Sequence, residues 1–292
     1  MFLNRQIAAR LALASVTLVG LLLVTATAQA GGRLLATGGI LEIEGSAGGG
    51  ITPWALIAGL GTNDQVGGSV GCTQVAPQDF RLDSCGVAVG IDDRVEFSAD
   101  QLRLNLGDAV PGQSIRLDVI GAKVRLFGDA VLDQNRWWPQ LAVGVQWKQN
   151  EDFNLVPRAL GARHARGIDV YLSATKIWLD GPFDHTWLAD ITLRDSEANQ
   201  IGLLGFGGDR GGYHVLAEGS VGVFLTDHVV LGGEYRQKPN NLSAFRENDW
   251  QDVFLAYFPI KNLSITAAFA NLGNIADKSG QRGYYVSLDG DW

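Results

Sequence analysis

Hydrophobic and polar residues alternate with a period of two along most of the chain. Within residues 140–148 (QLAVGVQWK), Leu141, Val143, Val145 and Trp147 share one face, and polar or small residues occupy the other. The same alternation recurs in residues 168–175, 187–194, 215–225 and 263–270. Successive side chains of a β-strand point to opposite faces, so this period predicts strands and an all-β fold.

The alternating segments predict up to fourteen strands, an even number as in bacterial membrane barrels. Their expected ranges are 39–47, 52–62, 65–75, 79–90, 94–104, 115–127, 138–149, 167–178, 186–196, 212–225, 228–237, 249–258, 261–272 and 281–292. A separate strand at 201–206 would spoil this count, and twelve strands is the alternative.

Two features favour a membrane barrel over a soluble sandwich. The polar faces carry many small residues, which suit a lumen, and aromatic residues flank the strands as in the aromatic girdles of membrane barrels. These aromatics are Trp137, Trp138, Trp147, Trp178, Trp187, Trp250 and Tyr257. The short connections at 62–64, 90–93, 180–184, 226–227 and 259–262 fall on one side, the periplasmic side, and the long connections at 150–166, 197–211 and 238–248 fall on the other.

The last strand ends on an aromatic residue. Tyr284, Val286, Leu288 and Trp292 share one face, although Gly290 interrupts the series. A terminal strand of this kind predicts recognition by the barrel-assembly machinery.

Residues 1–30 read as a secretory signal peptide. Arg5 and Arg10 precede an uncharged apolar run at 11–24, and Ala28-Gln29-Ala30 forms a small-x-small cleavage site. Cleavage near Ala30 would leave residues 31–292 as an outer-membrane barrel domain in a Gram-negative bacterium. It would also remove two arginines and change the net charge from −8 to −10.

The predicted strand faces also yield a charge map of the lumen with six acids and six bases. The candidate lumen-lining residues are Glu96, Asp100, Lys123, Arg125, Lys148, Asp169, Lys176, Asp190, Arg194, Glu218, Glu234 and Arg236. The surplus acids, including Asp289 and Asp291, are expected in turns, loops and strand ends. Such a balance predicts a small conductance with only weak cation selectivity.

One strand changes its pattern. Ile115, Leu117 and Val119 alternate in one phase, whereas residues 120–126 alternate in the other. A β-bulge near Val119 would explain the change.

Cys72 and Cys85 are the only cysteines. A tight hairpin turning at 75–79 places them opposite each other on adjacent strands, and an exported protein meets an oxidising compartment. We therefore expect a disulfide between them.

Little in the sequence indicates catalysis or cofactor binding. The acidic balance argues against a nucleic-acid partner, and the four histidines lack zinc-ligand spacing, so neither a metal nor another cofactor is expected. Asp184-His185 and Asp227-His228 fall in turns and are read as polar turn residues, so no catalytic residue is assigned. Outer-membrane lipid and lipopolysaccharide are the expected partners. Arg158, Arg163 and Arg166 could contact the phosphates of lipopolysaccharide, although a solvated loop is the preferred interpretation.

Five stretches resemble a known family. They are residues 48–61 (GGGITPWALIAGLG), 121–129 (GAKVRLFGD), 202–210 (GLLGFGGDR), 234–241 (EYRQKPNN) and 271–283 (NLGNIADKSGQRG). They resemble the Gram-negative outer-membrane family catalogued as domain of unknown function 3034. The resemblance implies an outer-membrane barrel and supplies no catalytic residue.

The sequence as a whole therefore predicts a transmembrane antiparallel up-and-down β-barrel of about 12–14 strands. The leading functional hypothesis is a porin-like channel for ions or small polar solutes. A structural or lipid-binding barrel with an occluded lumen is the alternative, and a barrel hydrolase is the third reading.

Overall fold

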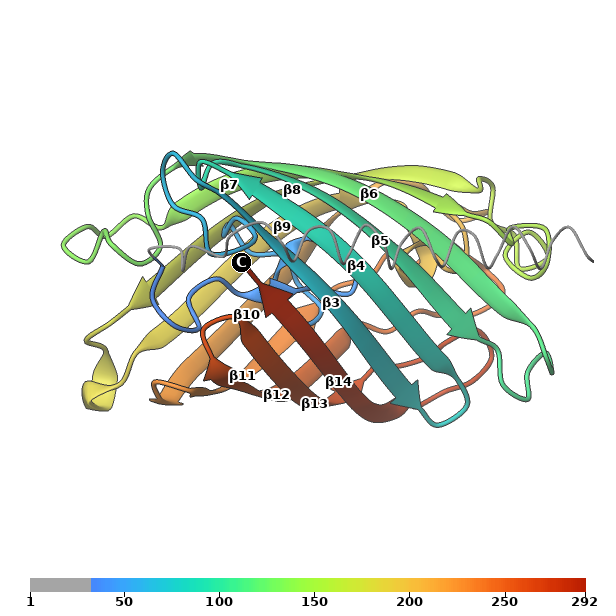
Figure 1. Cartoon of the computed structure of the whole chain (residues 1–292). Coiled ribbons are helices and arrows are strands. Elements are labelled where there is room, and N and C mark those ends of the chain that lie inside the picture. Colours follow the sequence, from blue (N-terminus) through green and yellow to red (C-terminus); the bar gives the residue numbers. More distant parts are fainter. Residues whose placement is uncertain (1–32) are drawn as a thin grey trace, which may run out of the picture.

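The computed structural model describes residues 33–292, so the expected signal peptide lies outside the described residues. Within these described residues, twelve antiparallel strands, β3 to β14, form one closed barrel in which each strand pairs with its sequence neighbours and β14 pairs with β3 (Figure 1). Closure pairs the backbone of every strand on both sides and removes free sheet edges. In the described part, no helix is long and apolar enough to cross a membrane.

The strands are long and their connections alternate between the two ends of the barrel. Their bounds are β3 Val66–Pro77, β4 Arg81–Ile91, β5 Val95–Asn105, β6 Ser114–Phe127, β7 Gln140–Asn150, β8 Arg166–Trp178, β9 Trp187–Ser196, β10 His214–Thr226, β11 Val229–Arg236, β12 Trp250–Ile260, β13 Leu263–Asn271 and β14 Arg282–Asp291. Two short 3₁₀ helices, η1 Pro182–Asp184 and η2 Asn199–Gly202, lie in connections. The twelve expected strands from 65–75 onward lie within two residues of these bounds.

We name the two ends of the barrel by what they carry. The C-terminal rim holds the end of β14 and the connections 92–94, 128–139, 179–186, 227–228 and 261–262. The loop rim holds the connections 78–80, 106–113, 151–165, 197–213, 237–249 and 272–281. Four of the five expected short connections lie at the C-terminal rim, and the three expected long ones lie at the loop rim. The grouping by length is incomplete, because the long connection 128–139 lies at the C-terminal rim and the short connection 78–80 lies at the loop rim. The fifth short connection, expected at 62–64, precedes β3 and joins no two wall strands.

The two strands expected at 39–47 and 52–62 are not part of the barrel wall. Every residue from 39 to 61 is buried, and this internal segment lies inside the barrel (Figure 1). It contains only a short pair of strands, β1 Ile40–Leu41 and β2 Ala47–Gly48. The prediction of fourteen strands was therefore wrong, and the alternative of twelve is correct. Residues 201–206 form no barrel strand either; they belong to the connection between β9 and β10.

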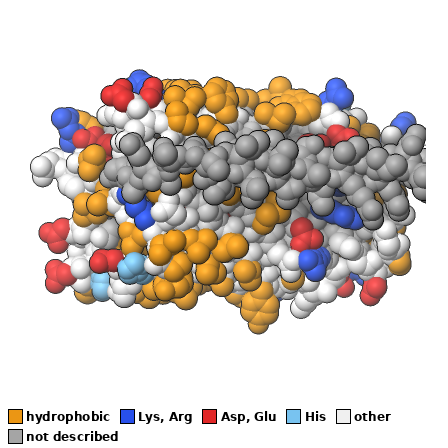
Figure 2. All heavy atoms as spheres, viewed as in Figure 1, with side chains coloured by type: hydrophobic (Ala, Val, Ile, Leu, Met, Phe, Trp, Pro, Cys, Tyr) orange, Lys and Arg blue, Asp and Glu red, His pale blue; other side chains and the backbone are white. Residues whose placement is uncertain are grey.

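The outer wall carries an apolar belt. Large hydrophobic side chains are exposed on every barrel strand, among them Phe97 on β5, Ile191 on β9, Val253 on β12 and Tyr284 on β14. Figure 2 shows hydrophobic side chains gathered over the middle of the visible wall, with charged side chains towards both ends. The burial pattern is thus inverted relative to a soluble protein, as expected for a wall that faces lipid.

Near the loop rim the same wall reverts to the pattern of a soluble protein. We call this part, residues 74–83 and 101–119, the collar. Its outer face is polar, with hydrogen bonds from Gln74 to Asp83 (3.0 Å) and from Gln101 to Asp118 (2.7 Å). Its inner face is apolar and buried, with side chains from β3 to β6; these are Val75, Leu82, Leu102, Leu104, Ile115, Leu117 and Val119.

The collar explains the change of phase in β6. The ladder between β5 and β6 is continuous from Val95↔Val124 to Asn105↔Ser114, so the bulge expected near Val119 was wrong. The register of β6 does not change near Val119, but the surroundings of its two faces do. Leu117 and Val119 point into the apolar collar, whereas Ile120 and Val124 point outward into the belt.

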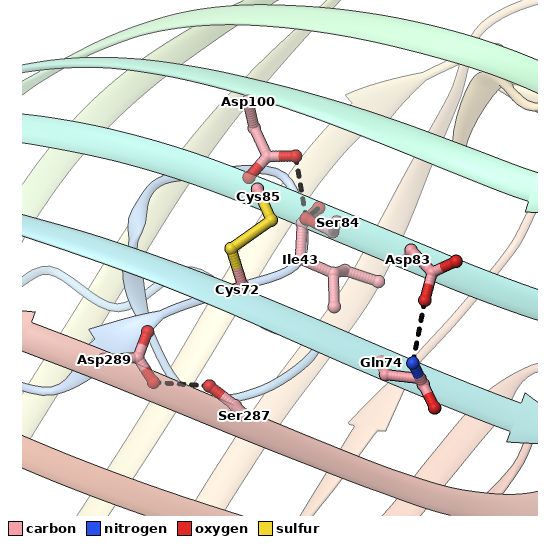
Figure 3. Close-up of a disulfide and its surroundings, with 9 residues drawn as sticks. All are labelled: Ile43, Cys72, Gln74, Asp83, Ser84, Cys85, Asp100, Ser287 and Asp289. Atoms are coloured by element: carbon pink, nitrogen blue, oxygen red, sulfur yellow. Dashed lines mark hydrogen bonds between the residues drawn. A yellow bond between two sulfur atoms is a disulfide. The ribbon is translucent and has the colours of Figure 1, made fainter. Parts of the chain in front are cut away.

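Cys72 lies directly opposite Cys85 in the β3–β4 ladder, and the structure joins them by a disulfide. Figure 3 shows the bridge between β3 and β4, near the Ser84–Asp100 and Ser287–Asp289 hydrogen bonds. Both cysteines are exposed on the outer face. They lie between the apolar belt and the polar outer face of the collar.

Candidate functional site: the filled lumen

Eleven of the twelve predicted lumen-lining residues are buried inside the barrel. The remaining one, Arg125, lies near the C-terminal rim, where its Nη1 is 2.6 Å from Oδ2 of Asp93. The period-two reading therefore assigned the inner face of the wall correctly. It did not reveal what these side chains meet, because their main partners belong to the internal segment.

Glu44 of the internal segment is the centre of the largest charge cluster. Its carboxylate accepts hydrogen bonds from Nζ of Lys148 on β7 and from Nη2 of Arg236 on β11, the latter at 2.6 Å. Nη1 of Arg194 on β9 lies 3.5 Å away. All four side chains are at most 3% exposed, so three wall strands hold one carboxylate away from bulk water.

Wall carboxylates complete this cluster. Lys148 also contacts Asp169 at 2.5 Å, and Arg194 contacts Glu218 at 2.6 Å. Glu42 accepts a hydrogen bond from Nε2 of Gln146 at 2.9 Å. Each of the three cations in this cluster, Lys148, Arg194 and Arg236, thus has more than one acidic partner, which offsets the large cost of removing a charge from water.

A second cluster anchors the middle of the internal segment to β5 and β6. Nζ of Lys123 donates to Oγ of Ser46 and to the carbonyl oxygens of Ala47 and Trp54, at 2.9–3.1 Å. It also pairs with Glu96 at 3.2 Å. Because Lys123 binds two backbone carbonyls of the segment, it fixes the path of the chain as well as a single side chain.

Glu234 on β11 binds the backbone of the internal segment in the opposite sense. Its carboxylate accepts hydrogen bonds from the N–H groups of Gly50 (2.6 Å) and Ile51 (3.0 Å) and from the hydroxyl of Thr52 (2.6 Å). Thr52 and Ser220 also approach each other, with their hydroxyl oxygens 2.5 Å apart. A Cβ on Gly49 would lie 2.0 Å from Oε1 of Glu234, so glycine permits this close approach.

The remaining predicted lumen residues serve smaller hydrogen-bonded sites. Asp190 accepts from the hydroxyls of Thr175 (2.6 Å) and Thr192 (3.0 Å). Asp100 accepts from Ser84 at 2.7 Å. Lys176 donates at 2.6 Å to the carbonyl oxygen of Asp133, in the connection after β6.

Both ends of the internal segment meet the C-terminal rim. Just before it, Arg33 pairs with Asp93 in the β4–β5 turn, and Asp93 also binds Arg125. Burial raises the pKa of Asp93, and the two arginines oppose this shift. After the segment, the N–H of Leu60 donates to the carbonyl oxygen of Trp292 at 3.0 Å. The segment therefore enters and leaves the lumen at one end.

The loop rim is closed by a different part of the chain. Residues 198–206, between β9 and β10, fold inward and are buried. The N–H of Gln200 donates to the carboxylate of Glu247, and Nζ of Lys238 donates to Oε1 of Gln200 at 2.8 Å. Burial raises the pKa of Glu247 to about 7 and lowers that of Lys238 to about 8.

Sequence reasoning missed several interior acids. Glu42 and Glu44 lie in the segment that was wrongly predicted to be a barrel strand. Asp252 and Asp289 are also buried, although Asp289 was counted among the surplus acids of turns, loops and strand ends. Within residues 33–292 the buried charged side chains comprise eleven acids and six bases. The predicted balance of six and six was therefore wrong. A strict period of two along β12 and β14 would have assigned Asp252 and Asp289 to the inner face.

The structure also shows the contacts of Trp250 and of two of the histidines. Trp250, expected in a girdle, points inward with 2% exposure, and Nζ of Lys238 lies 4.9 Å from its ring. His214 pairs with Asn241 at 3.0 Å, and Nδ1 of His228 lies 2.6 Å from the carbonyl oxygen of Phe258. No group of three or more potential metal ligands occurs in the described part of the chain.

The last strand carries its aromatic face outward. Tyr284, Val286 and Leu288 are 53–70% exposed on the outer wall. Trp292 follows β14, exchanges backbone hydrogen bonds with Gly68, and lies where a Cβ on Gly68 would be 2.3 Å from its ring. This residue therefore helps close the barrel between its last and first strands.

A closed antiparallel barrel with a lipid-facing belt and a polar interior is an outer-membrane β-barrel. The chain belongs to the family described as Protein of unknown function (DUF3034), whose model matches residues 37–289. No curated protein matches it.

Several solved structures share the architecture at low sequence identity. A KdgM porin is 10% identical, with a TM-score of 0.48 over 76% of this chain and 98% of that chain. Omp33 of Acinetobacter baumannii is 7% identical, with a TM-score of 0.44 over 79% and 99%. Outer membrane phospholipase A from Escherichia coli is 10% identical, with a TM-score of 0.40 over 78% and 91%. At these identities no activity is transferred.

Proposed function

We propose that the protein is a porin-like channel for ions or small polar solutes that is closed at rest by its internal segment. The observation that carries the proposal is the complete burial of residues 39–61 within a wall of charged side chains. Many contacts between segment and wall are ion pairs and hydrogen bonds, for which water can substitute when the segment leaves. Catalysis is not part of the proposal.

The path of the internal segment supports gating. Because both of its ends meet the C-terminal rim, it can be withdrawn as a loop from that side without threading the chain through the barrel. We take the C-terminal rim to face the periplasm, so the segment would move towards the periplasm. The Arg33–Asp93 pair would then act as a latch at this mouth.

The rival proposal is a structural or lipid-binding barrel whose lumen never opens. The density of buried ion pairs around Glu44 favours it, since such a cluster could fix the segment permanently. The two proposals differ in one measurable property, the conductance of the protein in a planar bilayer.

A reversible lock would distinguish them. The hydroxyl oxygens of Thr52 and Ser220 are 2.5 Å apart, so the double variant Thr52→Cys/Ser220→Cys places two sulfurs within bonding reach. We expect brief openings from the wild type, none from the oxidised variant, and recovery of openings when a reductant is added. Wild type with the same reductant is the control, because the native Cys72–Cys85 bridge is reduced too.

Two outcomes would count against the channel. Equal conductance of wild type and oxidised variant would show that ions do not pass through the space the segment occupies. Silence of the wild type and of Glu44→Gln at all voltages would favour the structural barrel.

The compartment and partners are part of the same proposal. We expect fractionation with the outer membrane, heat-modifiable migration on gels, and a mature chain that begins near Gly31. Arg158 and Arg163 in the connection 151–165 and Arg166 at the start of β8 are exposed at the loop rim, where lipopolysaccharide phosphates would lie. Recovery as a soluble periplasmic protein would contradict the assignment.

A further inference from the structure

A hollow that is separate from the charge clusters lies at the loop rim. It is a crevice of about 170 Å³ whose lining comes from six connections and the end of β5. Its floor is apolar and buried, formed mainly by Phe80, Leu104, Leu106, Leu204 and Ile275. None of these side chains takes part in the polar contacts around the internal segment.

The crevice is accessible from outside the barrel. Val156, Leu160 and Phe245 on its sides are half-buried, and Ala109 and Ala244 at its edge are exposed. The outer wall at this height is the polar collar, with Arg81 and Arg103 exposed. The crevice therefore opens into water above the lipid belt and is not a surface that acyl chains of the bilayer cover.

The volume of the crevice sets the size of its occupant. A water molecule occupies about 30 Å³ in the liquid, and a dry apolar cavity of about 150 Å³ in another protein binds benzene or xenon. Because most of the lining offers no hydrogen-bond partner, water gains little there. One six-membered ring would fill the space and cover the half-buried side chains.

Charge narrows the chemistry of the occupant further. Among residues 33–292, Asp277 is the single charged residue of the lining, and it is exposed at the edge. In the same part of the chain no lysine or arginine lines the crevice to hold a carboxylate or phosphate. A neutral molecule therefore fits better than a fatty acid or a phosphorylated headgroup.

We propose that this crevice binds one small neutral apolar molecule, about the size of a monocyclic aromatic hydrocarbon, from the external aqueous side. Binding would connect the loops 106–113, 151–165, 237–249 and 272–281 through one shared contact. The proposal does not depend on whether the lumen conducts.

Fluorine NMR of fluorobenzene tests the proposal with the full-length mature protein in nanodiscs, with empty nanodiscs as the baseline for partition into lipid. We expect saturable line broadening with the protein and none with 4-fluorobenzoate beyond the baseline. Val156→Phe fills the crevice and should weaken binding about tenfold or more. Leu155→Phe is the matched control, since Leu155 is next to Val156 in sequence but its side chain is exposed and lies outside the lining of the crevice.

A second variant guards against misfolding. If Val156→Phe loses its heat-modifiable migration, Ala244→Trp at the exposed edge should block the same crevice. Broadening no greater than in empty nanodiscs would overturn the proposal. Equal broadening by the filled variant and the Leu155→Phe control would overturn it as well.

Discussion

The carboxylate of Glu44 lies 2.6 Å from Nη2 of Arg236, so a residue of the internal segment and a residue of the barrel wall share a buried ion pair. The pair joins positions 192 residues apart in sequence. It makes the occupied lumen part of the folded state.

Neutralising Glu44 should loosen the internal segment. Glu44→Gln removes the negative charge shared by Lys148 and Arg236, and breaking a buried pair in this way costs roughly 3–5 kcal/mol. We expect amides of residues 39–61 to exchange with deuterium at least about a hundredfold faster than in wild type. Glu151→Gln, at an exposed loop position, is the control. Unchanged exchange in Glu44→Gln would show that the cluster does not hold the segment.

The Cys72–Cys85 bridge should leave no thiol for labelling. We expect maleimide to label the denatured wild type only after reduction, and to label Cys85→Ser at Cys72 without reduction. Since the loop closed by the bridge is short, its reduction should lower the free energy of unfolding by about 3 kcal/mol in the chain-entropy model. Labelling of unreduced wild type would contradict the pairing.

The closure at the loop rim should depend on pH. The pKa of Glu247, about 7, exceeds its unfolded value, so its contribution to stability is full at low pH and is lost as pH rises through 7. The pKa of Lys238, about 8, is depressed, so its contribution is full at high pH and is lost as pH falls through 8. Burial causes both shifts, and together they predict a minimum of local stability near pH 7–8.

Hydrogen-exchange protection of residues 198–206, corrected for the intrinsic effect of pH, measures this minimum. Glu247→Gln should remove the rise towards acid and keep the rise towards alkali. Protection that is greatest at pH 7–8 would mean that the ion pair outweighs the cost of burial.

The open lumen should be cation-selective. With the internal segment withdrawn, Asp252 and Asp289 would add two inner-wall acids to the six that alternation identified. Reversal potentials in a KCl gradient should show this preference, measured with Glu44→Gln to favour opening. Adding Asp252→Asn and Asp289→Asn should weaken it, whereas adding Asp180→Asn in a connection should not. Anion selectivity would refute this account of the lumen charges.

The terminal aromatic should matter for assembly. Trp292→Ala removes the aromatic ring that directly follows β14 and lies beside Gly68. We expect several-fold less heat-modifiable barrel in the outer membrane. Trp137→Ala, which removes a ring that is 89% exposed in a connection, should leave the yield unchanged. Equal yields of the two variants would argue against a C-terminal assembly signal.

The twelve wall strands could be predicted because lipid outside and polar groups inside impose one period on every strand. The internal segment could not, because Leu41 and Ile43 alternate with Glu42 and Glu44 just as wall residues do. Inside the barrel this alternation has another cause: the two glutamates meet wall cations or amides, while Leu41 and Ile43 pack in apolar clusters. Alternation with a period of two indicates that the two faces of a segment have different surroundings. It does not indicate which strand, if any, pairs with that segment.

The site was partly predictable for the same reason. Lys123 and Glu96 were assigned to the lumen by their face, but their hydrogen bonds to Ser46, Ala47 and Ala58 depend on where a distant stretch of backbone lies. The residues that line the crevice at the loop rim show no regular hydrophobic period in the sequence. Its lining comes mainly from connections, whose packing follows from tertiary contacts and has no local signature.

The reversal of faces within β6 means that the outer face of one strand contacts water in the collar and lipid in the belt. Between Val119 and Ile120 the surroundings of an outward side chain change. Arg116 is exposed to water, whereas an outward arginine in the belt would cost about 0–1 kcal/mol at its edge and roughly 2–4 kcal/mol at the bilayer midplane. Denaturants and proteases in the medium can reach the collar while lipid shields the belt. The barrel should therefore come apart in two stages, and its loop end should tolerate sequence change that its lipid-embedded half would reject.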